Sequence, residues 1–159
     1  MEPHTDTSEM GPLNSEYLDV IVSDVRVRND FAFSVQILNT EGVLPDEIVS
    51  GADRNTLGIA SLEKLMREFS IHHQSPATPP SGFVPRGGDL VSAKFSDGAW
   101  YRAKIRRASP VKKEAEVTFI DYGNQDTVAY SNIRPLDPKF RSLPGQAQDA
   151  RLRFVLYFI

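Results

Sequence analysis

Four aromatic side chains and one amide stand beside two predicted turns in the second half of the chain. They are Phe95, Tyr101, Phe119, Tyr122 and Asn124. Pairing of the strands that flank these turns would bring both turns to one rim. Aromatic faces attract a cation whose charge is spread over methylated nitrogens, and an amide oxygen accepts a hydrogen bond from a guanidinium N–H. The five residues therefore predict either a cage for a methylated cation or part of an ordinary aromatic core.

Four neighbouring residues are interpreted as structural. Trp100 and Phe140 need not lie at the corner formed by the five residues above, so we expect both to pack in the interior. Asp97 and Asp121 each stand at a predicted turn, where a short carboxylate accepts hydrogen bonds from backbone N–H groups. We expect these two aspartates to be turn formers.

A basic strand offers a second binding surface. Arg102, Lys104 and Arg106 alternate along one predicted strand and therefore share a face. Such a face could hold the phosphates of RNA, whose bases would stack on the nearby aromatic rings. A solvated outer face of a barrel would give the same alternation. RNA is therefore an alternative ligand, with these three side chains as its candidate contacts.

The sequence contains no recognisable catalytic or metal site. It has no cysteine, and its three histidines, His4, His72 and His73, lack the i, i+4 spacing of a helical zinc site. We expect these histidines to be solvated. Nucleophile-elbow, phosphate-binding and dinucleotide-binding glycine motifs are also missing. We therefore expect a binding protein with no catalytic residue, no cofactor and no metal, and not an enzyme.

The residues of the predicted cage lie among five short strands. Alternating apolar and polar residues indicate strands at 89–95, 99–107, 115–121, 125–130 and 132–136. Residues 96–98 and 122–124 have the composition of tight turns between them. Because no helical pattern interrupts these strands, we expect a small, strongly bent barrel and not a parallel sheet with crossover helices.

The first half predicts a hairpin and a helix. Period-two alternation indicates two paired strands at about 17–28 and 31–38. Apolar residues in 57–69 recur at helical spacing, and Asn55 or Thr56 can cap that helix. We interpret the apolar stripe as the face of an amphipathic helix that packs on the core.

Three further segments connect or end these elements. Residues 1–16 are polar and indicate a flexible lead-in, and 74–82 contain adjacent prolines typical of a linker. Residues 150–159 indicate a final apolar strand. An exposed apolar strand promotes aggregation, so we expect it to pair with the hairpin or with sequence missing from this chain.

The charge of the chain is unevenly distributed. The 159 residues carry a net charge of −3, which divides into −8 for residues 1–82 (5 Lys and Arg, 13 Asp and Glu) and +5 for residues 83–159 (13 and 8). This asymmetry indicates a charged partner or two modules that face each other.

The sequence shows no targeting or membrane segment. No stretch approaches the ~20 apolar residues of a membrane span, and a signal peptide is not recognisable. We expect a soluble monomer in the cytoplasm, with the nucleus as a second location and no membrane partner.

Two segments carry a family resemblance. Residues 93–103 and 117–124 resemble the signature of the Tudor domain: an aromatic strand, a D-G turn, W-Y-R-A, and then F-I-D-Y-G-N. The flanking segments at 20–25, 33–36, 62–66 and 143–147 resemble the extended Tudor region of the Tudor-staphylococcal-nuclease (Tudor-SN) family. The resemblance implies a mainly β fold of the α+β class. In it, a five-stranded, SH3-like Tudor barrel is inserted into an incomplete OB-like, staphylococcal-nuclease-like domain with one linking helix.

The resemblance also implies domain boundaries. It covers roughly residues 17–159 and leaves 1–16 as the lead-in. Residues 17–82 supply the first part of the OB-like scaffold with its helix and linker. The Tudor barrel occupies 83–142, and 143–159 return into the truncated scaffold.

In the Tudor-SN family, the extended Tudor cage binds symmetrically dimethylated arginine in Arg/Gly-rich proteins, and the family is linked to RNA metabolism and RNA silencing ribonucleoproteins. The resemblance places Phe95, Tyr101, Phe119, Tyr122 and Asn124 on the cage positions. Phe119 stands where a tyrosine is also seen. The acidic first half would attract an Arg-rich peptide. The nuclease repeats of the family are absent, so nuclease activity is not assigned, and a fragment of a multi-repeat RNA nuclease is an alternative.

Overall fold

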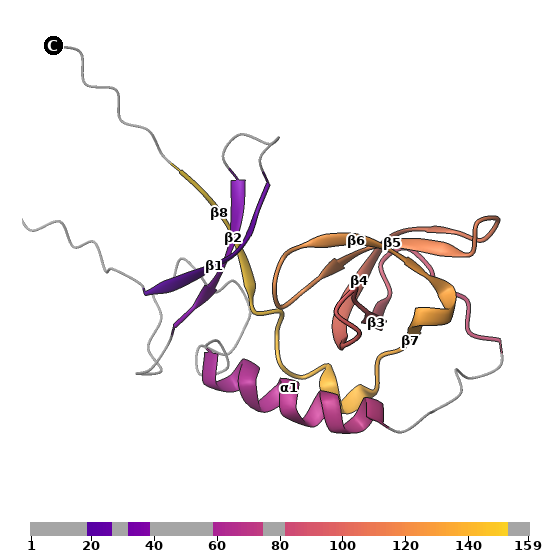
Figure 1. Ribbon diagram of the computed structural model, residues 1–159, viewed down its shortest axis with the longest axis horizontal. Coiled ribbons are helices and arrows are strands. Elements are labelled where there is room, and N and C mark those ends of the chain that lie inside the picture. The colour runs from indigo at the N-terminus through magenta and orange to yellow at the C-terminus, as the bar shows by residue number, and fades with distance from the viewer. Residues whose placement is uncertain (1–18, 27–31, 39–58, 75–81, 153–159) are drawn as a thin grey trace, which may run out of the picture.

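The computed structural model describes residues 19–26, 32–38, 59–74 and 82–152. They form two antiparallel sheets and one long helix (Figure 1). A small sheet has the strand order β1-β2-β8, and a larger sheet has the order β6-β5-β4-β3-β7. The chain builds two strands of the small sheet, then the helix and the whole larger sheet, and returns to the small sheet with β8. This mainly β arrangement with one helix confirms the predicted fold class.

The larger sheet is the predicted barrel. Its strands are β3 (Leu90–Lys94), β4 (Trp100–Ser109), β5 (Glu114–Phe119), β6 (Gln125–Ala129) and β7 (Ile133–Pro135). Successive side chains point to opposite faces of a strand, so Ala115, Val117 and Phe119 of β5 are buried while the residues between them are partly exposed. They form the barrel core together with Val91 and Ile105. The five predicted strands are confirmed.

The small sheet consists of β1 (Val20–Val25), β2 (Ala32–Ile37) and β8 (Ala147–Arg151). β1 and β2 form the predicted hairpin, and β8 pairs with the other edge of β2. The last strand therefore pairs with the hairpin as expected, but it begins at Ala147 instead of residue 150. Its first residues, Ala-Gln-Asp, lack an apolar strand pattern, and pairing with β2 determines their conformation.

Helix α1 (Ile59–Gln74) confirms the predicted amphipathic helix and lies along the lower side of the molecule in Figure 1. Leu62, Leu65 and Phe69 are buried on one stripe of the helix. They cluster with Leu136 and Phe140, which follow the last barrel strand. The helix thus packs on the segment that leads from the barrel back to the small sheet.

Two short 3-10 helices complete the described structure, η2 (Tyr130–Asn132) and η3 (Pro138–Phe140). The Asp137 carboxylate caps η3 by accepting a hydrogen bond from the backbone N–H of Lys139 at 3.0 Å. The predicted lead-in, both candidate helix caps, most of the linker and residues 153–159 lie outside the described residues. No helix in the described part of the chain is long and apolar enough to cross a membrane.

His73, near the end of α1, packs against the barrel. Its ring stacks on Trp100 with centroids 5.2 Å apart and an interplanar angle of 19°. Its Nδ1–H donates to the Phe69 carbonyl oxygen at 2.7 Å. The prediction of solvated histidines is therefore wrong for His73, because the helix continues past Phe69 and carries this ring onto the barrel. Trp100 and Phe140 pack against their neighbours, as predicted.

We expect the packing of His73 on Trp100 to stabilise the folded protein less as the pH drops below 6.5, the ordinary pKa of histidine. Burial lowers the pKa of His73, and the charges of His72, Arg134 and Lys139 lower it further. Below that pH the unfolded chain binds a proton that the folded chain does not, so protonation favours unfolding; well above it both states are neutral and the effect vanishes. Urea titrations at pH about 5.5 and about 7.5 should show a smaller loss of stability for His73→Gln than for the wild type. An equal loss of stability in both proteins would show that protonation of His73 does not cause the pH dependence.

Candidate ligand-binding site

Six side chains line one cavity of about 130 Å³ beside the two turns of the barrel. They are Phe95, Asp97, Tyr101, Phe119, Tyr122 and Asn124. The structure thus brings together all five residues of the predicted cage. Sequence reasoning assigned Asp97 only to the turn and missed its place in the cavity. The available signal was its position four residues before Tyr101 across that turn.

The four rings meet edge to face. The ring centre of Tyr101 lies 5.4 Å from that of Tyr122, 5.9 Å from Phe119 and 6.3 Å from Phe95, with interplanar angles between 80° and 85°. Edge-to-face pairs are a favoured arrangement of aromatic rings, so the walls support one another. Phe119 is 1% exposed and also belongs to the barrel core. It is therefore both the buried end of the cavity and a core residue.

The two tyrosines of the cavity keep their protons at neutral pH. The Tyr101 hydroxyl donates to Asp97 Oδ2 at 2.5 Å, and the backbone N–H of Ala99 donates to Asp97 Oδ1 at 2.9 Å. Burial and the Asp97 carboxylate raise the pKa of Tyr101. Burial raises the pKa of Tyr122, and the negative charges of Asp121 and Asp97 add to that rise. The bond from Ala99 confirms Asp97 as a turn former.

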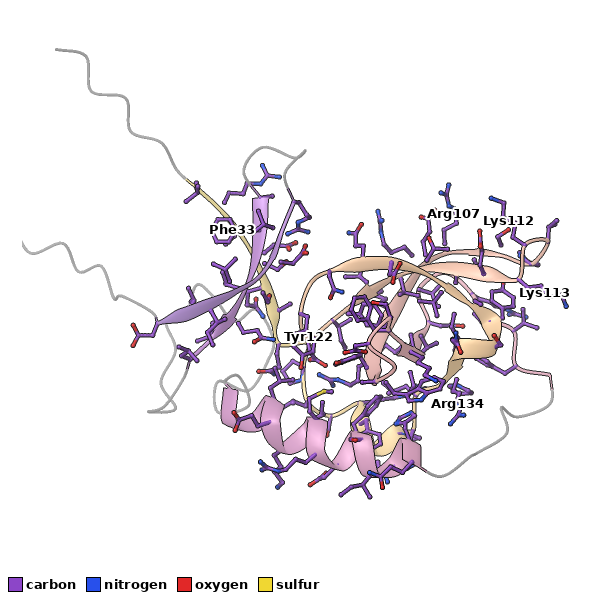
Figure 2. All side chains as sticks on the ribbon, viewed as in Figure 1. Phe33, Arg107, Lys112, Lys113, Tyr122 and Arg134 are labelled. Carbon is purple, nitrogen blue, oxygen red and sulfur yellow. The ribbon has the colours of Figure 1, made fainter. Side chains whose placement is uncertain are left out.

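The small sheet holds the corner that carries Tyr122, which lies between that sheet and the barrel (Figure 2). Three successive carbonyl oxygens of the corner accept hydrogen bonds from three strands. Ala147 N–H of β8 donates to Ile120 O at 3.1 Å, Gln36 Nε2 of β2 to Asp121 O at 2.7 Å, and Ser23 Oγ of β1 to Tyr122 O at 2.6 Å. The small sheet therefore fixes the backbone from which one wall of the cavity projects.

Gly123 completes this corner, and we expect Gly123→Ala to destabilise the fold by about 1–3 kcal/mol. Its φ is +87°, and an added Cβ would overlap Oγ and Cβ of Ser34. Alanine would both strain the backbone and push β2 away. Thermal unfolding of the variant measures the loss. Gly88→Ala is the matched control, since Gly88 also has a positive φ (+92°) but nothing within 4 Å of an added Cβ.

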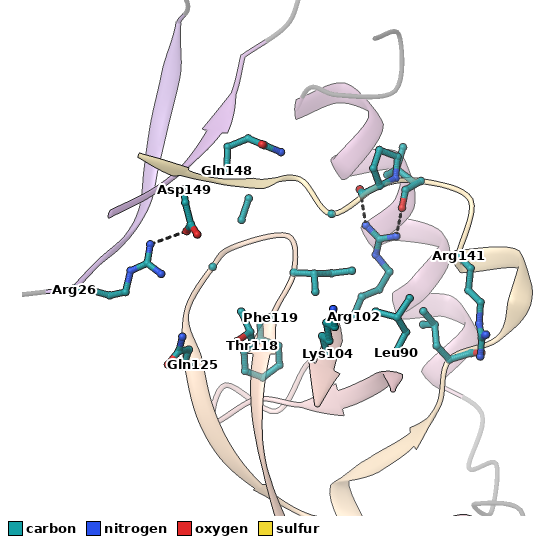
Figure 3. A pocket seen from close by; sticks show the side chains of 17 residues that line it. Arg26, Leu90, Arg102, Lys104, Thr118, Phe119, Gln125, Arg141, Gln148 and Asp149 are labelled. Atoms are coloured by element: carbon teal, nitrogen blue, oxygen red, sulfur yellow. Dashed lines mark hydrogen bonds and ion pairs between the residues drawn. The ribbon is translucent and has the colours of Figure 1, made fainter. Parts of the chain in front are cut away.

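Arg102 is not available to a ligand. Its side chain is 1% exposed and forms an ion pair with Asp121, also 1% exposed. Arg102 Nη1 donates to the carbonyl oxygen of Phe140. Arg102 also donates from Nη1 to that of Leu143 and from Nη2 to that of Pro144 (Figure 3). The segment 140–144, which leads from the barrel back to the small sheet, covers the outer face of β4 at Arg102. The prediction of Arg102 as an RNA contact is therefore wrong. Asp121 is likewise the partner of a buried cation, and not merely a turn former.

Lys104 and Arg106 are exposed on β4, and Arg106 Nη1 donates to Gln125 Oε1 at 2.8 Å. Lys104 lines an open groove of about 840 Å³ between the barrel and β8, together with Arg26 and Arg141 (Figure 3). Arg26 is paired there with Asp149 at 2.7 Å. Binding of RNA by Lys104 and Arg106 stays a prediction. Within the described ranges, no group of three or more potential ligand side chains is placed to hold a metal ion.

Comparison with known proteins identifies the family to which this chain is similar. A family model described as the Tudor domain matches residues 53–153. The chain is 44% identical over 104 residues to Ribonuclease TUDOR 1 of Arabidopsis thaliana, and the match covers 61% of this chain and 10% of that protein. The chain thus spans about a tenth of the length of this curated relative.

Two solved structures share the fold. The extended Tudor domain of Drosophila melanogaster Tudor-SN (p100) has a TM-score of 0.67 at 29% identity, covering 86% of this chain and 54% of that one. The human TDRD1 extended Tudor domain in complex with a symmetrically dimethylated E2F peptide has a TM-score of 0.62 at 26% identity, covering 87% and 61%. Together with the match of the family model, these similarities show that the chain belongs to the Tudor domain family, with the extended Tudor fold found in Tudor-SN.

Proposed function

We propose that this protein is a non-enzymatic binding module that reads symmetrically dimethylated arginine in Arg/Gly-rich protein segments. The observation that carries the proposal is the cavity walled by Phe95, Tyr101, Phe119 and Tyr122, which Asn124 also lines. The structural similarity to an extended Tudor domain in complex with a symmetrically dimethylated peptide supports it. The mechanism requires no catalytic group and no cofactor.

The chemistry of the cavity matches a planar, methylated cation. A dimethylguanidinium group enters between the rings, and each cation–π contact contributes about 0.5–2 kcal/mol. Asn124 accepts a hydrogen bond from a remaining N–H and orients the group. After the entropic cost of association, these contacts predict micromolar to millimolar affinity for one mark.

Methylation improves the fit because it removes N–H donors. An unmethylated arginine has five N–H groups, which is more than the few acceptors of this mainly aromatic cavity can satisfy, so some of them would lose water without gaining an acceptor. Two methyl groups instead add apolar surface that the rings can cover. The module should therefore prefer the dimethylated side chain to the unmethylated one.

The partner would be a cationic protein segment that carries several marks. One weak contact becomes useful when neighbouring marks rebind from a high effective concentration. The net charge of −8 on residues 1–82 would attract the arginines that flank the mark. We place such a partner in cytoplasmic ribonucleoproteins of RNA silencing.

Calorimetric titration of matched Arg/Gly-rich peptides tests the proposal. The peptides share one sequence and differ only in the central arginine, which is either unmethylated or symmetrically dimethylated. We expect the dimethylated peptide to bind the wild type about 3- to 30-fold more tightly. Equal affinity for the two peptides, or no binding of either, would overturn the proposal.

A further inference from the structure

Asp97 places a negative charge on the wall of the cavity. We propose that Asp97 is a specificity-determining residue whose carboxylate pairs electrostatically with the bound guanidinium, so that the cavity reads positive charge as well as methyl groups. The inference rests on the proposed function, because it names a determinant of the same site. It gives Asp97 a role beyond that of a turn former.

The carboxylate is held in place by two hydrogen bonds. Oδ1 accepts from the Ala99 backbone N–H at 2.9 Å, and Oδ2 accepts from the Tyr101 hydroxyl at 2.5 Å. Each oxygen atom is therefore fixed on one side and can still accept from a ligand, because a carboxylate oxygen has two lone pairs. The group that orients one ring of the cavity also carries the charge.

This charge is not neutralised by the protein. Within the described residues, Asp97 takes part in no ion pair. Asp121, which directly precedes the turn at 122–124, is instead paired with Arg102. Asp97 also lines the cavity, and Asp121 does not. The cavity is thus left with one uncompensated negative charge.

The effect of that charge reaches both tyrosines. Apart from burial, Asp97 contributes to raising the pKa of Tyr101 and of Tyr122, because a negative charge disfavours a phenolate beside it. A field that disfavours an anion at these rings favours a cation in the space between them. The geometry and the electrostatics therefore agree on the sign of the ligand.

Asp97→Asn separates charge from shape. Asparagine keeps an oxygen that can accept from Ala99 or Tyr101, and it removes the negative charge. Glu68→Gln is the matched control, because Glu68 lies on the exposed side of α1, does not line the cavity, and loses the same formal charge. Circular dichroism and melting temperature establish that each variant is folded.

The experiment is a titration of wild type, Asp97→Asn and Glu68→Gln with the dimethylarginine peptide and with the same peptide carrying neutral citrulline. At about 0.05 M salt we expect Asp97→Asn to bind the dimethylarginine peptide about 3- to 10-fold more weakly than the wild type, and Glu68→Gln to match the wild type. At about 0.5 M salt the difference should shrink, because exposed charges are screened. We expect the citrulline peptide to bind neither wild type nor variant measurably.

The outcomes separate the two proposals. If the wild type prefers the dimethylated peptide and Asp97→Asn binds it equally well at low salt, the role of Asp97 is overturned and the proposed function stands. A deficit in Asp97→Asn that is independent of salt would also overturn it, since that result indicates a change of shape. If the wild type shows no preference for the dimethylated peptide, the proposed function is wrong. The proposed role of Asp97, which depends on that function, is then wrong as well.

Discussion

Replacing Asp121 with alanine is expected to lower the free energy of unfolding by about 3–5 kcal/mol, because it leaves the Arg102 guanidinium buried without its counter-charge. Arg102 Nε and Nη2 both donate to the Asp121 carboxylate, at 3.0 and 2.5 Å. Its remaining N–H groups donate to three carbonyl oxygens of residues 140–144. The backbone N–H of Gln146 also donates to Asp121 Oδ1, at 3.1 Å. The pair therefore joins the barrel to the segment that returns to the small sheet.

Urea unfolding followed by the fluorescence of Trp100, the single tryptophan, measures this loss. Asp126→Ala is the control, since Asp126 is an exposed aspartate of β6 and its replacement should cost less than about 1 kcal/mol. Replacing both partners, with Arg102→Met and Asp121→Leu, should recover part of the stability that Asp121→Ala loses. A loss of less than about 1 kcal/mol for Asp121→Ala would show that the pair does not hold the fold together.

Tyr122→Ala is expected to weaken binding of the dimethylarginine peptide by about 10- to 100-fold, the largest effect on function among single changes of the cavity. The change removes one cation–π face and opens the wall that packs edge to face on Tyr101 at 5.4 Å. The backbone hydrogen bonds of the corner do not depend on this ring, so the fold should persist. Calorimetric titration with the same peptide measures the effect.

Phe83→Ala is a matched control for that titration. Phe83 is a partly buried ring that packs on the barrel core and does not line the cavity. Its loss should reduce stability without a comparable loss of affinity. Equal affinity of the peptide for the wild type and for folded Tyr122→Ala would show that the cavity does not bind the dimethylarginine side chain.

The strands of the barrel could be predicted from sequence because their signals are local. Residue spacing left open whether the rings line a cavity or fill the core, and only the resemblance to the extended Tudor region favoured the cavity. Alternating apolar residues indicate the strands, and the turns at Gly98 and Gly123, both with positive φ, determine which strands pair. Once those pairs are known, Phe95, Tyr101 and Phe119 must come to one end of the barrel. The helix from Ile59 was predictable for the same reason, since its apolar spacing is local.

The features that were missed depend on contacts between distant segments. Arg102 alternates with Lys104 as a solvated strand residue would, and only the segment at 140–146, about forty residues later, buries it. The ring of His73 is covered because α1 ends against Trp100. The start of β8 at Ala147 follows from pairing with β2, which is more than one hundred residues away in the chain. No local pattern encodes such pairings.

The most direct test of the proposed cage is an NMR titration of a peptide whose dimethylarginine methyl groups carry ¹³C. Methyl groups enclosed by aromatic faces experience ring currents, so we expect both methyl resonances to move upfield on binding the wild type. We also expect this movement to be smaller with Tyr122→Ala at matched saturation, because one of the four rings is removed. Methyl resonances that keep their free positions when the peptide is saturated, or that move equally with the variant, would contradict a dimethylguanidinium held between Phe95, Tyr101, Phe119 and Tyr122.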